Sequence, residues 1–339
     1  MTVKKEKHSC KSFKYLALLM GIMLFSFVFT AGGCSGNEGS ENGNEEERAS
    51  GFNEDEEKEE KEEQEIEPDP IQPVGAIIDN IDRARPQSGL QQASVVYEFL
   101  VEGGITRFMA FYDLPFEEDF HIGPVRSLRP YMAKQALEYG GIVAHGGYSS
   151  RTADKIQGMD LRHLANSDIF WRDNSRPSPH NMYTSMDRLR QAAGEEEHQR
   201  EKGTPLEEVN AEYKEHQGNT EREGVVEIEY YHNNRVSYTY DPETEKYLRY
   251  INGEPHQDIS GEQYTASRVI LRNTPHYDVS GTPLVSIDLE GTGQGRLYEK
   301  GREYSLTWEK EGNTTSYYFE DGSQVNTGGG TTWIQVVKQ

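Results

Sequence analysis

Arginine and histidine side chains gather at the ends of short apolar runs in the middle of the sequence. Arg126 and Arg129 are three residues apart ahead of an amphipathic stretch, and His145 is followed by Gly146 and Gly147. Residues three apart share one face of a helix, and arginine matches phosphate or carboxylate in bidentate geometry. Glycine lets the backbone approach a ligand closely. The pattern predicts an anion site near the positive end of a helix.

Residues of the same kind occur in the neighbouring loops, which is where open α/β sheets usually bind ligands. His145 and Asp79 are the candidates for acid–base catalysis, because their side chains can exchange protons near neutral pH when suitably placed. The predicted ligand-binding residues are Asn80, Arg85, Glu102, Arg107, Arg126, Ser127, Arg129, His145, Gly146, Gly147, His180 and Asn181.

A purely structural interpretation competes with the anion site. The arginines could pair with carboxylates on neighbouring runs and only hold the domain together. This scaffold interpretation is favoured for Arg107, His145 and His180, and both alternatives stay open for Arg126 and Arg129. The carboxylates available for such pairs are Asp79, Glu98 and Glu102.

Known catalytic and cofactor motifs are absent from the sequence. It contains no HExxH, no GxSxG, no P-loop and no GxGxxG after a strand, so we expect neither a metal nor a cofactor. The glycine-rich stretch 291–295 lies among β-forming residues and is predicted to be a turn rather than a phosphate cradle. Both cysteines, Cys10 and Cys34, lie near the amino terminus, so the rest of the chain can form no disulfide and no thiolate metal site.

The elements that must position these residues differ between the two halves of the chain. The first half mixes short buried runs with amphipathic stretches, and Gly140 and Gly141 end one of the latter. Pro130 is tolerated there if it lies in the first helical turn. The predicted strands are 74–79, 93–101, 107–112 and 142–144, and the predicted helices are 127–139 and 184–193.

The second half alternates apolar and polar residues in short runs, which is typical of strands. Residues 226–230 and 236–240 flank a turn at 232–234 and predict a hairpin. We therefore expect a two-lobed α/β or α+β chain: a mixed-sheet amino-terminal domain with flanking helices, then a smaller mainly-β domain. The predicted bounds are 71–194 and 223–339, with a polar linker over 195–222; further strands are expected near 269–271, 285–289, 304–308, 316–319 and 333–337.

The amino terminus has the order of a secretory signal: five lysines, an apolar run over 15–31, then small residues. A retained transmembrane anchor is the alternative. Cys34 favours lipidation, since Ala31-Gly32-Gly33-Cys34 is similar to the bacterial lipobox, although Ala31 stands where leucine is commonest. We predict a signal peptide over 1–33 and an acidic, disordered tether over 34–70.

The net charge of −23 is unevenly distributed. Residues 1–34 carry +4, residues 35–70 carry −13, and the remaining −14 falls on 71–339. An acidic domain argues against nucleic-acid binding, which needs a basic face. The expected partners are the membrane, through palmitate or similar chains on Cys34, and an anionic small molecule, a glycopolymer or a protein, all on the extracytoplasmic face of the cell envelope.

Several long motifs resemble the YerB-like family of bacterial lipoproteins, over about residues 71–339. That resemblance implies a lipoprotein with an amino-terminal α/β-type domain and a smaller carboxy-terminal domain, and it implies no established activity. The motifs are Ile78–Asn80, Ala84–Leu90, Tyr97-Glu98, Val101–Phe108, Ile122–Pro130, Pro179–Ser185 and Gly330–Val337.

A looser similarity points to enzymes of the LytR–CpsA–Psr class, which transfer lipid-linked glycopolymers and place arginines around a pyrophosphate. Their Arg–Asp pairs are absent here, since Phe108 follows Arg107 and Ser127 follows Arg126. Three functions are therefore compared. A non-catalytic binding lipoprotein is favoured over a scaffold that uses its β domain, and over an envelope enzyme with an arginine clamp and His145 or Asp79 as the acid–base group.

Overall fold

The computed structural model describes residues 73–113, 118–194, 225–325 and 329–339, all within one compact unit, Ile66–Gln339. The predicted signal peptide, Cys34, the tether and the linker over 195–222 lie outside the described residues. None of the helices in the described ranges has the length and apolarity that a membrane crossing requires.

The amino-terminal half is a mixed sheet with a few helices, as predicted. Strands β1 (Val74–Asp79) and β2 (Val95–Leu100) each pair antiparallel with β3 (Thr106–Tyr112), and β5 (Ile142–Ala144) runs parallel to β1. The other elements are β4 (His121–Ile122), β6 (Arg162–Leu164), β7 (Trp171–Arg172), β8 (Met182–Ser185), helices α1 (Pro130–Glu138), α2 (Ser150–Ile156) and α3 (Met186–Gly194), and the 3-10 turns Asp82–Ala84, Leu90–Gln92, η3 (Glu102–Gly104) and Ser167–Ile169.

Helix α1 begins and ends where its sequence requires. Pro130 occupies its first turn, where a missing backbone donor costs nothing. Gly140 and Gly141 follow with φ of 81° and 76°, a left-handed conformation that other residues rarely adopt. The helix is therefore shorter than the predicted 127–139: residues 126–129 precede it outside any helix, and the backbone of Arg129 is extended.

The carboxy-terminal half is mainly β, which confirms the predicted fold class. The expected hairpin is formed by β9 (Val225–Tyr231) and β10 (Asn234–Asp241). The remaining strands are β11 (Lys246–Ile251), β12 (Glu254–Pro255), β13 (Thr265–Ala266), β14 (Arg268–Thr274), β15 (His276–Asp278), β16 (Val285–Ile287), β17 (Gly291–Glu299), β18 (Arg302–Glu311), β19 (Thr314–Phe319) and β20 (Thr332–Lys338).

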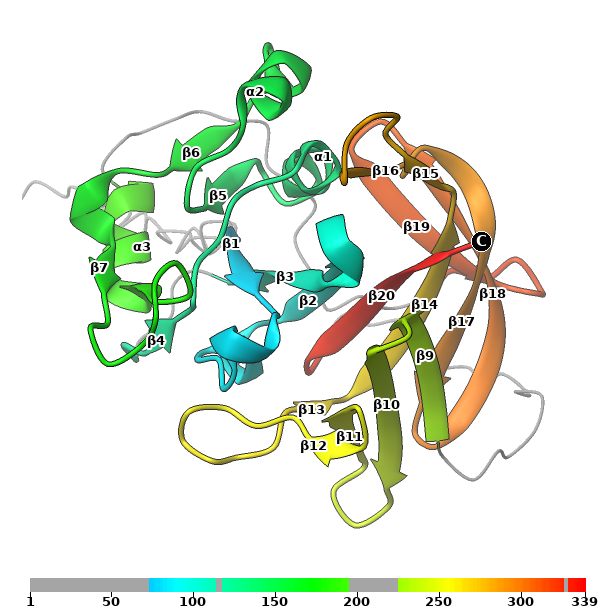
Figure 1. Ribbon diagram of the computed structural model, residues 1–339. Coiled ribbons are helices and arrows are strands. Elements are labelled where there is room, and N and C mark those ends of the chain that lie inside the picture. The colour runs from blue at the N-terminus through cyan, green and yellow to red at the C-terminus, as the bar shows by residue number, and fades with distance from the viewer. Residues whose placement is uncertain (1–72, 114–117, 195–224, 326–328) are drawn as a thin grey trace, which may run out of the picture. The chain divides into compact units, whose positions relative to one another are not determined.

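The two halves share one sheet (Figure 1). In the described part of the chain this sheet has ten strands in the order β19-β18-β17-β14-β20-β2-β3-β1-β5-β6. The last strand, β20, lies between β14 and β2 and is parallel to both. The carboxyl terminus of the chain therefore joins the sheet of the second half to that of the first.

The shared sheet is covered on both faces, which explains why its central strands are apolar almost throughout. On one face, Ile78 and Phe108 pack with residues of the β9–β11 sheet and of α3. On the other face, Ile77 and Phe99 pack with α1 and with residues such as Trp308. Successive residues of a strand point to opposite faces, so each central strand contributes to both cores.

The predicted turn over 291–295 is wrong, because these residues begin strand β17. A Cβ on Gly293 would lie 2.6 Å from the Trp308 ring, and one on Gly295 would lie 2.6 Å from the Leu271 carbonyl oxygen. The glycines make room for a buried tryptophan and a neighbouring backbone. Glycine inside a strand often marks such a close approach.

Candidate functional site

Strand β1 ends at Asp79 and is followed by Asn80; both polar residues are buried and point to opposite faces of the sheet. Asn80 points to the same face of the sheet as Ile78, and Ile78 packs against the β9–β11 sheet. Asp79 points to the same face of the sheet as Ile77, which is the face that α1 covers. In the pairing of β1 with β3, Asp79 lies opposite Arg107. Each of the two residues belongs to a different group of polar side chains.

The group around Asp79 is the arginine cluster, defined here as Asp79, Glu102, Arg107, Arg126, Arg129 and His180. Strands β1 and β3, turn η3, the extended segment before α1 and the loop before β8 each supply members. The sequence predicted five of these residues as ligand-binding and Asp79 as a catalytic candidate, so the structure brings together residues spread over a hundred positions.

Arg107 is the buried centre of this cluster. Its side chain is 3% exposed and donates from Nη1 to the Ser127 carbonyl oxygen at 2.9 Å. Its Nη2 lies 3.3 Å from Oε1 of Glu102. Arg129 donates from Nε to Oε2 of Glu102 at 3.1 Å and from Nη2 to Oε1. One carboxylate thus holds two arginines, which supports the structural interpretation for both.

Arg126 differs from the other two arginines. Its Nε forms an ion pair with Oδ2 of Asp79 at 3.0 Å, and its side chain is 24% exposed. The same Oδ2 lies 2.7 Å from Nδ1 of His180. Among the described residues, no hydrogen bond or ion pair involves the terminal nitrogens of Arg126 or Nε2 of His180. These are the atoms of the cluster that could bind a ligand.

Arg126 and Arg129 do not share a helical face, so that prediction is wrong. Helix α1 begins at Pro130, with Arg129 as its cap residue, and Arg126 lies in the preceding extended segment. This segment is held against β1, because Arg126 N donates to the Ile77 carbonyl oxygen at 2.8 Å. Arg126 therefore lies in the segment before the helix, and only Arg129 lies at the amino-terminal end of α1.

The electrostatics of the cluster leave an excess of positive charge. Three arginines and two carboxylates give a formal charge of +1 with His180 neutral, in a region of the chain that is acidic overall. Burial lowers the pKa of Arg107 to about 10, and the charge of Arg129 acts in the same direction. Burial raises the pKa of Glu102, but the hydrogen bond from Arg129 and the charge of Arg107 outweigh it and lower that pKa.

Two guanidinium nitrogens of the cluster are buried without a hydrogen-bond acceptor among the described residues: Nε of Arg107 and Nε of Arg126. The contact of Arg126 with Asp79 is close enough for an ion pair, but its direction is not that of a hydrogen bond. A buried donor without an acceptor costs roughly 1–3 kcal/mol. Such a cost is typical of sites that are completed by water or by a ligand.

His145, Gly146 and Gly147 lie beside this cluster through backbone contacts. Gly146 N donates to the Arg126 carbonyl oxygen at 2.9 Å, and Leu128 N donates to that of Gly147 at 3.0 Å. Both ring nitrogens of His145 are engaged, since Nδ1 accepts from Gly147 N and Nε2 lies 3.0 Å from Nδ1 of His163. Burial lowers the pKa of His145 to about 4. These contacts favour a structural role over acid–base catalysis.

Three other predicted ligand residues have structural contacts. Arg85 donates to the side chain and backbone of Asn80 and to Asp82. Asn181 accepts from Arg172 and donates to the Asp173 carbonyl oxygen, which shapes the loop that carries His180. Ser127 contributes its carbonyl oxygen to Arg107, as described above.

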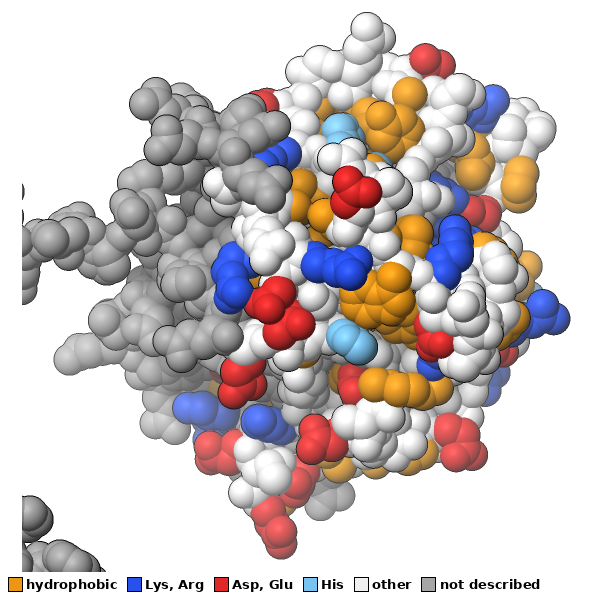
Figure 2. Space-filling model, turned by 90° about the vertical axis from the view of Figure 1, so that its left-hand side faces the viewer, with side chains coloured by type: hydrophobic (Ala, Val, Ile, Leu, Met, Phe, Trp, Pro, Cys, Tyr) orange, Lys and Arg blue, Asp and Glu red, His pale blue; other side chains and the backbone are white. Residues whose placement is uncertain are grey.

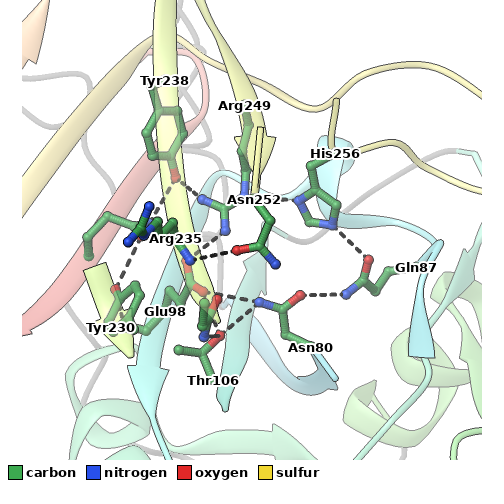
Figure 3. Close-up of polar contacts among 12 residues, drawn as sticks. Asn80, Gln87, Glu98, Thr106, Tyr230, Arg235, Tyr238, Arg249, Asn252 and His256 are labelled. Atoms are coloured by element: carbon green, nitrogen blue, oxygen red, sulfur yellow. Dashed lines mark hydrogen bonds and ion pairs between the residues drawn. The ribbon is translucent and has the colours of Figure 1, made fainter. Parts of the chain in front are cut away.

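Asn80 belongs to the second group, called here the buried network, which lies between the halves of the chain (Figure 3). Its members are Asn80, Gln87, Glu98, Thr106, Arg249 and His256. Its centre is the ion pair of Glu98 and Arg249, at 2.8 Å with both side chains 0% exposed. Asn80 and Thr106 donate to Oε1 of Glu98. Glu98 therefore pairs with an arginine of the second half, and not with the arginines of the first half considered from the sequence.

The network continues through a neutral histidine. Arg249 Nε can only donate, so Nδ1 of His256, at 2.9 Å, accepts, and its Nε2 donates to Gln87 Oε1 at 2.8 Å. Burial and then the charge of Arg249 hold the pKa of His256 well below its usual value. Gln87 in turn donates to the Asp79 carbonyl oxygen and to Asn80 Oδ1. The buried network thus reaches the arginine cluster.

Sequence reasoning missed Arg249 and His256, although a signal was present. Strand β11 alternates, and Tyr247, Arg249 and Ile251 all point inward. An arginine at an inward position of an alternating strand predicts a buried partner of opposite charge, since an unpaired buried charge is very costly. The guanidinium also lies over Trp333, 4.7 Å from the ring centre.

Figure 2 shows the face of the molecule that lies at the left-hand side in Figure 1. There, basic, acidic, histidine and hydrophobic side chains are interspersed. Among the described residues, no group of three or more His, Cys, Asp or Glu could hold a metal ion.

The structure thus defines a two-part protein in which an amino-terminal mixed sheet and a mainly-β second half share one ten-stranded sheet in the described residues. The chain belongs to the DUF3048 family, described as "Protein of unknown function": the N-terminal domain of that family matches residues 59–199 and its C-terminal domain matches residues 226–334.

YerB of Bacillus subtilis matches this chain both in sequence and in structure. "Putative lipoprotein YerB" of Bacillus subtilis (strain 168) is 31% identical over 279 residues, which are 78% of this chain and 81% of that protein. The crystal structure of YerB protein from Bacillus subtilis matches with a TM-score of 0.68 at 28% identity, over 79% of this chain and 91% of that chain. This agrees with the resemblance that the sequence motifs indicated.

Proposed function

We propose that this protein is a lipid-anchored extracytoplasmic lipoprotein whose arginine cluster binds an anionic group of an envelope ligand. The observation that carries the proposal is Arg126, whose terminal nitrogens face solvent while Asp79 fixes its Nε. Arg107, buried beside it with an unpaired Nε, adds positive charge that the cluster's two carboxylates do not cancel. A phosphate or carboxylate at Arg126 and His180 would complete the site.

The lipid anchor in this proposal is supported by the sequence around Cys34 and by the similarity to the Bacillus subtilis protein. The small residues before Cys34 resemble a lipobox, and the related Bacillus subtilis protein is named a lipoprotein. Two or more acyl chains on one cysteine would give stable membrane attachment. The acidic stretch after Cys34 would then act as a spacer between the membrane and the folded unit.

A second candidate function follows from the pair of Asp79 and His180. A carboxylate at 2.7 Å from Nδ1 orients the imidazole and leaves Nε2 available, which is how acid–base histidines are held in many enzymes. In that case His180, rather than His145, would be the proton-transfer group. Loss of ligand turnover but not of ligand binding in His180→Gln would support this alternative.

The binding proposal is tested by isothermal titration of the full-length chain with inorganic pyrophosphate. Arg126→Gln should weaken binding about tenfold or more, since it removes a charge-assisted contact. Arg235→Gln is the control, because Arg235 is exposed and lies outside the cluster. Equal affinity of the two variants would contradict the proposal, as would a large loss of thermal stability in Arg126→Gln, which would favour the scaffold.

A further inference from the structure

A pocket of about 370 Å³ lies between the two halves of the chain, away from the arginine cluster. Helix α1 forms one side, the end of α2 another, and the β15–β16 hairpin the third, which Figure 1 shows beside α1. Small-molecule sites are usually concave, with volumes of roughly 300–1,000 Å³. The pocket shares no residue with the arginine cluster, although Arg129 directly precedes Pro130 on its wall.

The walls of the pocket are held in place by one contact within the first half and one between the halves. Tyr131 of α1 is buried and its hydroxyl donates to the Leu100 carbonyl oxygen at 2.8 Å. Lys134, one turn further along α1, forms an ion pair at 3.1 Å with Glu290, which follows β16. The two halves of the chain therefore define one cavity, and neither half alone would form it.

The lining combines three kinds of chemistry. Met159, Val285 and Ile287 give an apolar surface. Ser286 and Asp288 offer a hydroxyl and a carboxylate, which can donate to and accept from hydroxyl groups. Tyr277 adds an aromatic ring that is 55% exposed, among the largest exposed apolar groups in the described residues.

Two cations, Lys134 and Lys155, also face the pocket. Lys155 is exposed, and no ion pair or hydrogen bond involves its ammonium group in the described ranges of the chain. Lys134 is already paired with Glu290, so Lys155 is the lining cation that remains available, and Asp288 is the carboxylate of the lining. An exposed ammonium group that pairs with no carboxylate in the described residues can pair with an acidic group of a ligand.

We propose that this pocket binds an acidic saccharide, that is, a sugar ring carrying a carboxylate or a phosphate. The C–H faces of the ring pack on Tyr277 and the apolar wall, and its hydroxyls bond to Ser286 and Asp288. The acid group pairs with Lys155. A fatty acid or other purely apolar anion would make no hydrogen bond to the Ser286 hydroxyl or to Oδ2 of Asp288, whose Oδ1 accepts from Glu290 N, so it would use less of the lining.

The experiment uses saturation-transfer NMR and titration on the full-length chain with glucuronate, glucose and acetate as probes. Glucuronate should bind with transfer to its ring protons, and glucose and acetate should each bind at least about tenfold more weakly, because each lacks one of the two contacts. Binding of glucose as tight as that of glucuronate would overturn the proposal, as would absence of glucuronate binding.

Variants locate the ligand. Lys155→Gln should weaken glucuronate binding about tenfold, while Lys246→Gln, at an exposed position on β11, should not change it. Tyr277→Ala should reduce transfer to the ring protons. In an Arg126→Gln background, Lys155→Gln should still weaken glucuronate binding about tenfold. If Arg126→Gln abolishes that binding and Lys155→Gln does not, the ligand occupies the arginine cluster and the pocket proposal is wrong, whatever the result with pyrophosphate.

Discussion

Replacing Arg249 by methionine tests whether the buried network holds the two halves of the chain together. Methionine keeps much of the apolar side chain but removes the charge and all donors. Glu98 then loses its counter-ion at 2.8 Å, while its side chain remains 0% exposed. His256 Nδ1 loses its donor as well, and the Tyr238 hydroxyl keeps the donation from Gln335 but loses that from Arg249. Most of the lost stability should therefore come from the Glu98 carboxylate, which stays buried without a counter-ion.

The size of the effect follows from that carboxylate. Removing one partner of a buried ion pair costs about 3–5 kcal/mol, and the lost contact with the Trp333 ring, 4.7 Å away, is included in this figure, because contributions of touching groups do not add. Folded proteins are stable by only about 5–15 kcal/mol. Arg249→Met should therefore lower the melting temperature by roughly 6–20 °C, at about 2–4 °C per kcal/mol.

The assays are thermal and urea unfolding of the full-length chain, monitored by circular dichroism and tryptophan fluorescence. The double variant Glu98→Gln with Arg249→Met should lose less stability than Arg249→Met alone, because no buried charge remains. Arg235→Met, at an exposed position, is the control. A loss below about 1 kcal/mol for Arg249→Met, or a double variant less stable than the single one, would refute the reasoning.

Two further predictions concern pH and anchoring. Burial lowers the pKa of His145 from 6.5 to about 4, and the charge of His163 acts in the same direction. Between these pH values the unfolded chain binds a proton at His145 that the folded chain does not. The free energy of unfolding should therefore fall by up to about 3 kcal/mol as the pH drops through this window. His145→Asn should flatten that dependence in urea midpoints measured from pH 4 to 8, while His256 and His276 titrate equally in both proteins; an unchanged slope would contradict this. Cys34→Ala should leave the protein without fatty acid and free of the membrane fraction, and palmitate labelling of the variant would refute the assignment of Cys34.

Local sequence patterns predicted the elements that depend on local interactions. The apolar runs 74–79 and 107–112 form β1 and most of β3, because β-branched and aromatic residues suit a sheet buried on both faces. Gly140 and Gly141 end α1 as expected, since only glycine adopts their backbone conformation easily. The hairpin of β9 and β10 followed from its alternation and turn residues.

Long-range pairing could not be predicted in the same way. Nothing local to 332–338 says that this strand inserts between β14 and β2, because any apolar strand can pair with either. The same limit applies to Arg249: alternation gives the face on which it lies, but only the sheet order places it against Glu98. Strand β17 was mistaken for a turn because its glycines serve the distant Trp308 rather than the local backbone.

The arginine cluster shows why site and scaffold are not exclusive alternatives. Arg107 and Arg129 are held by one carboxylate, which is the scaffold interpretation. Their contacts also fix the backbone at Ser127, next to Arg126, whose terminal nitrogens remain open. A binding group is most effective when neighbouring side chains hold it in place before the ligand arrives. The structural arginines would therefore supply the preorganisation, and Arg126 the contact with the ligand.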